Sequence, residues 1–247
     1  MSTSARVLRP LPGGYDQQRT TIQRVATHVL ARARFQAVGK FGLALAPGGI
    51  ATPAFGPDAT VVRITLAGLA VDRGGSTTWA SLDGASLRDL ALAAGADLEA
   101  DFSAGSDAPD LGDPDETLHV DRIAIDTMIA WLSAAWSGLD SILAGASQAP
   151  QATPARIQLW PEHFDAGTNV GVGPGADDRV NLGISLGDGF SPEPYLYGGP
   201  WSTDRPGDPA FWNAPFGAVR TYTEIARAAY PGAAARAFFD EVLGRFA

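Results

Sequence analysis

The segment 121–143 carries the clearest periodic pattern in the chain, and it limits the possible folds more than any other feature. Its apolar side chains recur every three or four positions: Ile125, Met128, Ile129, Leu132, Ala135, Trp136, Leu139, Ile142 and Leu143. This spacing places them on one face of an α-helix, and such a face is buried against other elements in a folded domain. The pattern therefore predicts a long helix in mid-chain, with Trp136 and Leu139 in the hydrophobic core.

Shorter patterns on both sides predict strands and further helices. Helical spacing or capping residues indicate helices over residues 16–34, 86–95, 222–229 and 232–246. Extended segments are expected at residues 35–45, 61–66, 77–82, 156–160, 180–186 and 195–197, with Gly74-Gly75 as a turn. Runs of strands followed by helices favour an α+β fold, with antiparallel sheets covered by helices, over a βαβ alternation.

An acidic segment over residues 101–116 interrupts these patterns with Gly, Pro and the carboxylates of Asp107, Asp110, Asp113 and Asp115. Such a composition is typical of a solvated loop or linker. A calcium loop is the alternative, but the spacing and the terminal Glu of an EF-hand are missing. The predicted organisation is an N-terminal α+β lobe over 1–100, an acidic loop over 101–118 and a C-terminal α+β lobe over 119–247, packed as one compact unit.

The two halves share an order of parts that would arise from an internal duplication. The tetrapeptide Ala33-Arg34-Phe35-Gln36 follows the first predicted helix, and Ala155-Arg156-Ile157-Gln158 follows the long one. Each half then passes through a Pro/Gly loop into an alternating strand. A duplication implies two related lobes, and a chance match of four residues is the alternative.

The composition excludes several classes of chemistry. The chain has no cysteine, so disulfides and thiolate sites are absent, and its histidines are His28, His119 and His163 alone. A net charge of −9 opposes binding to nucleic acid. No apolar run approaches the roughly 18–20 residues that span a bilayer, and the N-terminal residues lack a secretory signal pattern. We therefore expect a cytoplasmic protein without a membrane or nucleic-acid partner; its oligomeric state is not specified.

The segment 159–165 is the densest in chemically versatile side chains. If it is extended, His163 and Asp165 share one face, where a carboxylate can orient an imidazole as a general base. Asp188 and Glu193 are the further candidate acids in a later Gly/Pro-rich segment. A metal site of the facial-triad type needs a second histidine, and none follows His163, so neither metal nor cofactor is expected. An ordinary hydrogen-bonded histidine is the alternative.

Aromatic side chains gather in the same part of the chain. Trp160, Tyr195, Tyr197 and Trp201 are candidates for the wall of a small-molecule pocket, and packing within the core is the alternative. Three functions therefore remain: a binding protein with an aromatic-lined pocket, a hydrolase or isomerase that uses His163 with Asp165, Asp188 or Glu193, and a scaffold without a pocket. Convergence of these residues on one site distinguishes the three.

Several segments together resemble a family of uncharacterised bacterial proteins that is common in actinobacteria. They are Val38-Gly-Lys-Phe-Gly-Leu-Ala-Leu-Ala-Pro47, the stretch from Trp160 through His163-Phe164-Asp165, Pro192-Glu-Pro-Tyr-Leu-Tyr197, and Ala218-Val-Arg220 at the closing helix pair. The resemblance implies a bacterial cytoplasmic protein. It implies no activity, because the family is a domain of unknown function. The Ala- and Gly-rich composition, with Lys40 as the only lysine, is likewise typical of a high-GC genome.

Overall fold

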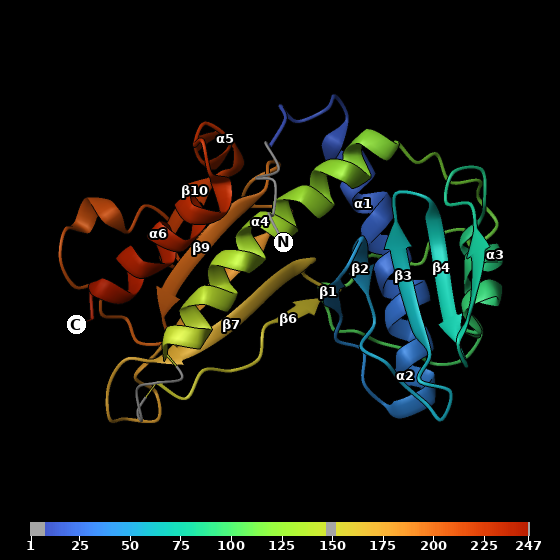
Figure 1. Cartoon of the computed structure of the whole chain (residues 1–247), viewed down its shortest axis with the longest axis horizontal. Helices are drawn as coiled ribbons and strands as arrows, with labels where there is room; N and C mark the ends of the chain where they lie inside the picture. The colour runs from blue at the N-terminus through green and yellow to red at the C-terminus, as the bar shows by residue number, and fades with distance from the viewer. Residues whose placement is uncertain (1–7, 147–151, 247) are drawn as a thin grey trace. The chain divides into compact units, whose positions relative to one another are not determined.

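The computed structural model describes residues 8–146 and 152–246, and these form two compact units (Figure 1). The N-terminal unit comprises residues 11–129 and 159–164, and the C-terminal unit comprises residues 1–10, 130–158 and 165–247. The division falls inside the long central helix, whereas the acidic segment 101–118 belongs wholly to the N-terminal unit. The long helix therefore contributes residues to both units.

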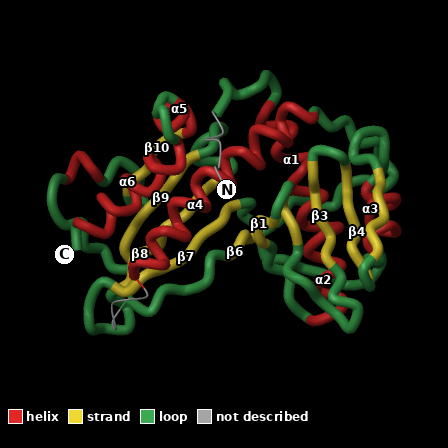
Figure 2. Tube along the Cα trace, viewed as in Figure 1, coloured by secondary structure: helices red, strands yellow, loops and turns green. Residues whose placement is uncertain are grey.

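The N-terminal unit combines a helical layer with an antiparallel sheet (Figure 2). Its helical segments are α1 (Tyr15–Val25), the π-helical η1 (Ala26–Ala31), α2 (Arg32–Val38) and α3 (Leu87–Ala94). Its strands are β1 (Ala44–Ala46), β2 (Gly49–Ala51), β3 (Val61–Thr65), β4 (Gly68–Arg73) and β5 (Ser76–Ala80). Each strand pairs with the next along the chain, in the order β1-β2-β3-β4-β5. Val62, Ile64, Leu69 and Val71 are buried, and β3 contacts η1 while β4 contacts α3.

Local chemistry explains where several of these elements begin and end. The Gly74-Gly75 turn has φ values of 56° and 84°, a left-handed conformation that suits two-residue hairpins. Ser86 and Asp89 form a reciprocal capping box at the start of α3, and Gly95 ends the helix in the left-handed region, as predicted. The prediction that residues 35–38 are extended is wrong, because the helix continues to Val38 and ends at Gly39 with φ 67°.

The C-terminal unit places helices on one face of a second antiparallel sheet. Its helices are α4 (Arg122–Ala146, from Ala130 onward), the short 3₁₀ η2 (Pro209–Phe211), α5 (Tyr222–Ala226) and α6 (Pro231–Gly244). The strands of its sheet are β6 (Gln158–Trp160, of which residues 159 and 160 belong to the N-terminal unit), β7 (Asp165–Gly171), β8 (Arg179–Ser185), β9 (Tyr195–Pro200) and β10 (Ala218–Thr221). The sheet order is β10-β9-β8-β7-β6. Residues 218–220, predicted to lie at a helix pair, form the edge strand β10 instead.

Glycines allow close packing in this unit. A Cβ atom added at Gly198 of β9 would lie 2.8 Å from Val242 Cγ1, so α6 rests directly on the strand. A Cβ at Gly138 of α4 would lie 2.9 Å from the backbone nitrogen of Arg236 in α6. The helices α4 and α6 therefore approach closely, and both lie on the same side of the sheet (Figure 1).

The tryptophans of α4 differ from expectation in their burial. Leu139 is fully buried, as predicted, but Trp136 is only partly buried. The buried tryptophan is Trp131, with 0% exposure, whose Nε1 donates a hydrogen bond to the Ser185 carbonyl oxygen at 2.9 Å. Its ring centroid lies 5.3 Å from that of Tyr222. Trp131 thus joins α4 to β8 and α5.

The structure confirms the α+β fold with antiparallel sheets covered by helices. Each unit runs from a long helix through a five-stranded meander to a further helix, an order that fits a duplication. The matched tetrapeptides are not equivalent, however: residues 33–36 lie in α2, whereas residues 155–158 lead into β6. None of the described helices is long and apolar enough to cross a membrane.

Candidate ligand-binding site

The face of the second sheet that points away from α4 and α6 is lined with glycine and polar residues. Burial alternates along β7, with Ala166, Thr168 and Val170 buried and the intervening positions half-buried. The register places Asp165 beside Ser185 and Tyr195 in one cross-strand row. The next row contains Gly167, Gly183 and Tyr197.

The ring of Tyr197 lies across the two glycines of its row. A Cβ atom at Gly183 would lie only 2.0 Å from Tyr197 Cζ, and one at Gly167 would lie 3.2 Å from the Tyr197 hydroxyl. The hydroxyl crosses both strands and donates a hydrogen bond to Asp165 Oδ2 at 2.5 Å. Glycine is therefore required at position 183 because the ring occupies the space of a side chain.

Tyr195 is held by a second carboxylate. Its hydroxyl donates to Asp188 Oδ2 at 2.5 Å. The other oxygen of Asp188 accepts hydrogen bonds from the backbone N–H groups of Phe190 and Ser191, at 2.8 and 3.2 Å. Asp188 therefore fixes the β8–β9 loop and orients Tyr195 at the same time.

Both tyrosine hydroxyls are kept neutral by their surroundings. Burial, reinforced by the neighbouring carboxylate of Asp188, raises the pKa of Tyr195 above its ordinary value. Burial and the charge of Asp165 raise the pKa of Tyr197 in the same direction. The two tyrosines thus act as hydrogen-bond donors to carboxylates, and neither is suited to act as a base or nucleophile near neutral pH.

Two phenylalanines complete an aromatic cluster, which we define as Phe190, Tyr195, Tyr197 and Phe216. The ring centroids of Phe190 and Phe216 are 5.0 Å apart in an edge-to-face arrangement. Phe216 also lies 6.4 Å from Tyr195 and 6.3 Å from Tyr197. Phe190 and Phe216 are 48% and 40% exposed, so the cluster presents two phenyl rings to solvent above the buried Tyr195 and the half-buried Tyr197.

The other predicted aromatic residues lie outside the cluster. Trp201 donates from Nε1 to Asn181 Oδ1 at 2.8 Å, and the Arg179 guanidinium lies 5.8 Å from its ring. Trp160 belongs to the N-terminal unit, where its ring contacts Phe41 edge-to-face at 6.3 Å. Of the four aromatic candidates, the structure therefore brings Tyr195 and Tyr197 together.

Glu193 has a structural role at the start of α5. Its Oε2 accepts hydrogen bonds from the backbone nitrogen and the hydroxyl of Thr223, at 3.1 and 2.6 Å. A carboxylate at a helix N-terminus satisfies amide donors that lack an intrahelical partner. Glu193 thus stabilises this helix start, whereas Asp165 and Asp188 each bind a tyrosine of the cluster.

His163 lies in a turn and not on a strand, so the condition under which His163 and Asp165 would share one strand face is not met. Residues 161–164 form a turn in which the Phe164 nitrogen donates to the Trp160 carbonyl oxygen at 2.8 Å. Phe164 adopts a left-handed backbone conformation, with φ 54°, and its ring is fully buried. The His163 Nδ1 atom lies 3.5 Å from Asp107 Oδ2, and both side chains are more than half exposed. His163 therefore pairs with the acidic segment, and Asp165 pairs with Tyr197.

The acidic segment is a loop without helix or strand, as predicted, but a row of side chains holds it in place. Arg24, His28, Arg32 and Gln36 follow one another at intervals of four and share one helical face. Arg24 donates to the Leu111 carbonyl oxygen at 2.7 Å, and the His28 Nε2 atom lies 2.7 Å from the Pro109 carbonyl oxygen.

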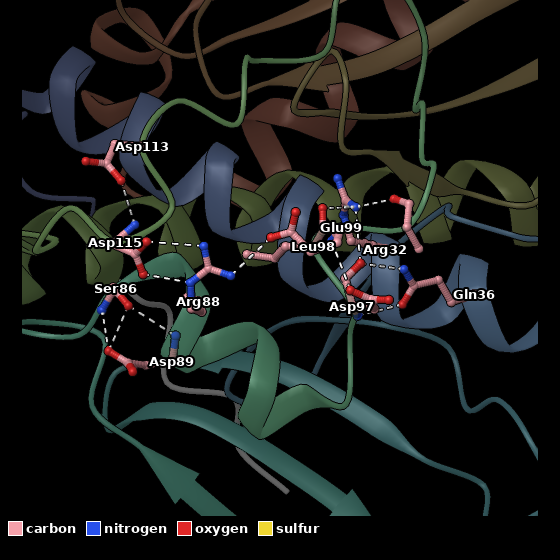
Figure 3. Close-up of polar contacts among 11 residues, drawn as sticks. Arg32, Gln36, Ser86, Arg88, Asp89, Asp97, Leu98, Glu99, Asp113 and Asp115 are labelled. Carbon is pink, nitrogen blue, oxygen red and sulfur yellow. Dashed lines mark hydrogen bonds and ion pairs between the residues drawn. The ribbon is translucent and has the colours of Figure 1, made fainter.

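The same row continues toward the start of the segment (Figure 3). Arg32 Nη1 donates to the carbonyl oxygens of Asp97, Leu98 and Ala100, and Gln36 exchanges two hydrogen bonds with the Asp97 backbone. Arg88 bridges Asp115 and Glu99 from α3, at 2.7 and 3.2 Å. The acidic segment is thus attached to the continuous helical run α1–η1–α2 and to α3.

His28 makes this attachment sensitive to pH. Its burial, with the positive charges of Arg32 and Arg24, lowers the pKa of the imidazole below its ordinary value of 6.5. The imidazole of His28 therefore binds a proton more readily in the unfolded chain than in the folded one. As a result, the free energy of unfolding falls as the pH drops below about 6.5. We expect His28→Gln to flatten the loss of unfolding free energy between pH 7 and pH 5 in urea titrations. The exposed His119→Gln is the control, and an equal flattening there would contradict this assignment.

Sequence reasoning missed Phe190, Phe216 and the glycines 167 and 183. The glycines carried a usable signal, since glycine within a strand often marks a close approach by another group. Within the described ranges 8–146 and 152–246, no three His, Asp or Glu side chains are grouped so that they could hold a metal ion. Comparisons with family models, curated proteins and solved structures find no match to this chain. The family resemblance therefore stays a prediction.

Proposed function

We propose that the protein binds a small organic molecule at the aromatic cluster of its C-terminal unit. The observation that supports this most is the pair of exposed rings, Phe190 and Phe216, fixed edge-to-face above Tyr195 and Tyr197. Clustered exposed aromatic side chains on a folded domain often mark a binding surface, whereas scattered ones need no explanation.

The cluster is well suited to hold its shape before a ligand arrives. Asp188 fixes both Tyr195 and the backbone of Phe190, and Asp165 fixes Tyr197 on its glycine floor. A surface that is already ordered loses little conformational entropy on binding. The two carboxylates also supply negative charge below the rings, so we propose a ligand with an apolar ring and a positively charged amine.

Matched probes test this proposal: phenethylammonium, which carries both features, and phenethyl alcohol, which lacks the charge. Two-dimensional ¹H–¹⁵N NMR titration should show both probes shifting the amide signals of residues 188–191 and 216–217, with the ammonium binding more tightly. Phe216→Ala should weaken the affinity for both probes about tenfold or more, which corresponds to about 1.4 kcal/mol.

Tyr230→Ala provides the control, because Tyr230 is a 68% exposed aromatic residue of the same unit outside the cluster. It should leave both affinities unchanged. An unaltered affinity in Phe216→Ala, or shifts that avoid the cluster residues, would show that the rings are not the binding surface. Equal affinities for the two probes would refute the proposed preference for a positively charged ligand, whereas the proposal of an apolar binding site at the cluster would still hold.

The structure offers less support to the alternatives. A hydrolase or isomerase based on His163 needs its partner carboxylate in a protected site, whereas His163 and Asp107 are both more than half exposed. A scaffold without a pocket needs no ordered pair of exposed phenyl rings. Cytoplasmic location and bacterial origin are proposals that rest on composition, namely the absence of cysteine and the Ala- and Gly-rich sequence.

A further inference from the structure

The edge strand β5 of the N-terminal unit is exposed on both faces. Residues 76–79 are all exposed, and Ala80 is half-buried. Trp79 is 57% exposed, which is unusual for a large apolar side chain in a strand. The sequence Ser-Thr-Thr-Trp-Ala contains no charge and no proline. It therefore lacks the features by which natural proteins protect edge strands from pairing.

The hairpin register shows which backbone groups of β5 point outward. Arg73 and Ser76 close the two-residue turn, so they form a hydrogen-bonded pair, and such pairs alternate along the ladder. Thr78 and Ala80 therefore bond to β4, whereas the N–H and C=O groups of Thr77 and Trp79 face away from the sheet. Among the described residues, those outward groups have no hydrogen-bond partner.

At other sheet edges of this chain, side chains or neighbouring segments occupy the outward backbone groups. The C-terminal unit ends its meander with β10, the counterpart of β5 in strand order. There the Asn213 side chain accepts from the Val219 nitrogen at 2.8 Å and donates to the Val219 carbonyl oxygen at 3.2 Å. Beside β1, Leu43 exchanges two backbone hydrogen bonds with Leu159. Among residues 8–146 and 152–246, none covers the outer edge of β5 in an equivalent way.

We propose that β5 pairs antiparallel with β5 of a second copy of this chain. A two-fold axis at Thr78 would place Thr77 opposite Trp79 of the second copy, and the reverse, so that four outward backbone groups of each strand are satisfied. All five positions are uncharged, so no like charges meet across the strands. The pairing would join two five-stranded sheets.

The net charge of the chain distinguishes pairing between two copies from binding of a basic partner, because the two respond oppositely to salt. Each copy carries −9, so long-range repulsion opposes self-association and is screened by salt. Dimer formation through β5 should therefore strengthen as the ionic strength rises. Binding of a basic partner at the same edge would weaken instead.

The experiment introduces a positive or a negative charge at Thr78. This side chain is exposed and would face Thr78 of the second copy across the two-fold axis. Sedimentation equilibrium of the full chain over a concentration series should show a monomer–dimer equilibrium. Thr78→Lys and Thr78→Glu should each weaken dimerisation at least tenfold, since like charges then lie opposite one another. An equimolar mixture of the two variants should recover the dimer.

Gln17→Lys adds the same charge at an exposed position of α1 and should leave dimerisation unchanged. A chain that stays monomeric at every concentration would overturn the proposal. So would a dimer that is indifferent to both Thr78 variants, or a mixture that remains monomeric. Circular dichroism of each variant checks that the unit is folded, and these outcomes are independent of probe binding at the aromatic cluster.

Discussion

Trp131→Ala should lower the free energy of unfolding of the C-terminal unit by about 3–5 kcal/mol. The side chain is completely buried, and its removal would leave a cavity between α4, β8 and the ring of Tyr222. The same change removes the hydrogen bond that Nε1 donates to the carbonyl oxygen of the buried Ser185. Urea unfolding, followed by far-ultraviolet circular dichroism, measures the effect.

Trp136→Ala is the matched control on the same helix. Because Trp136 is only partly buried, its truncation should cost clearly less than that of Trp131. Trp131→Phe separates the two contributions, since it keeps a ring in the core and removes the Nε1 donor. If Trp136→Ala were the more damaging change, the assignment of Trp131 to the core would be wrong.

The mistaken choice between these tryptophans has a physical cause. A single apolar stripe describes a helix that is buried on one side, and α4 instead lies on a sheet and against α6 at Gly138. A helix with two buried sides carries a wider apolar surface, on which Trp131 and Trp136 are both acceptable. Only the long-range contacts with Ser185 and Tyr222 distinguish the two positions.

Elements whose boundaries are set by neighbouring residues could be predicted from the sequence, because they do not depend on long-range contacts. The helix from Leu87 to Ala94 carries its capping box and its terminal glycine in the sequence, and the Gly74-Gly75 hairpin carries its turn. The turn at residues 161–164 has no comparable signal. It depends on the buried ring of Phe164 and on Gln23, whose side chain donates to the carbonyl oxygens of Pro161 and Glu162.

The candidate site was predictable in part. Tyr195, Tyr197, Asp165 and Asp188 were all selected from the sequence, but as the wall and floor of a pocket around His163. Their actual pairing depends on the register of three strands, which brings Asp165 and Tyr197 together across 32 positions of sequence. Register follows from the burial of a whole sheet face, so it cannot be derived from one strand alone.

Gly183→Ala should destabilise the C-terminal unit by about 1–3 kcal/mol, because the new methyl group would overlap the Tyr197 ring. The nearest ring atom lies 2.0 Å from the required Cβ position, so the ring must leave the strand surface and its hydroxyl must leave Asp165. Gly189→Ala is the control in the following loop, where a Cβ would meet nothing within 4 Å.

A second readout identifies the ring as the cause. The chain has five tyrosines, and the raised pKa of Tyr197 keeps its hydroxyl protonated in alkaline solution while the protein remains folded. Displacement from Asp165 into solvent removes the burial and the adjacent charge that raise this pKa, so one more tyrosine should ionise in an ultraviolet titration of Gly183→Ala. In a Tyr197→Ala background the same glycine substitution should be nearly neutral, since additivity fails only for groups in contact. A full penalty in that background would mean that the strand backbone, and not the ring, requires glycine at this position.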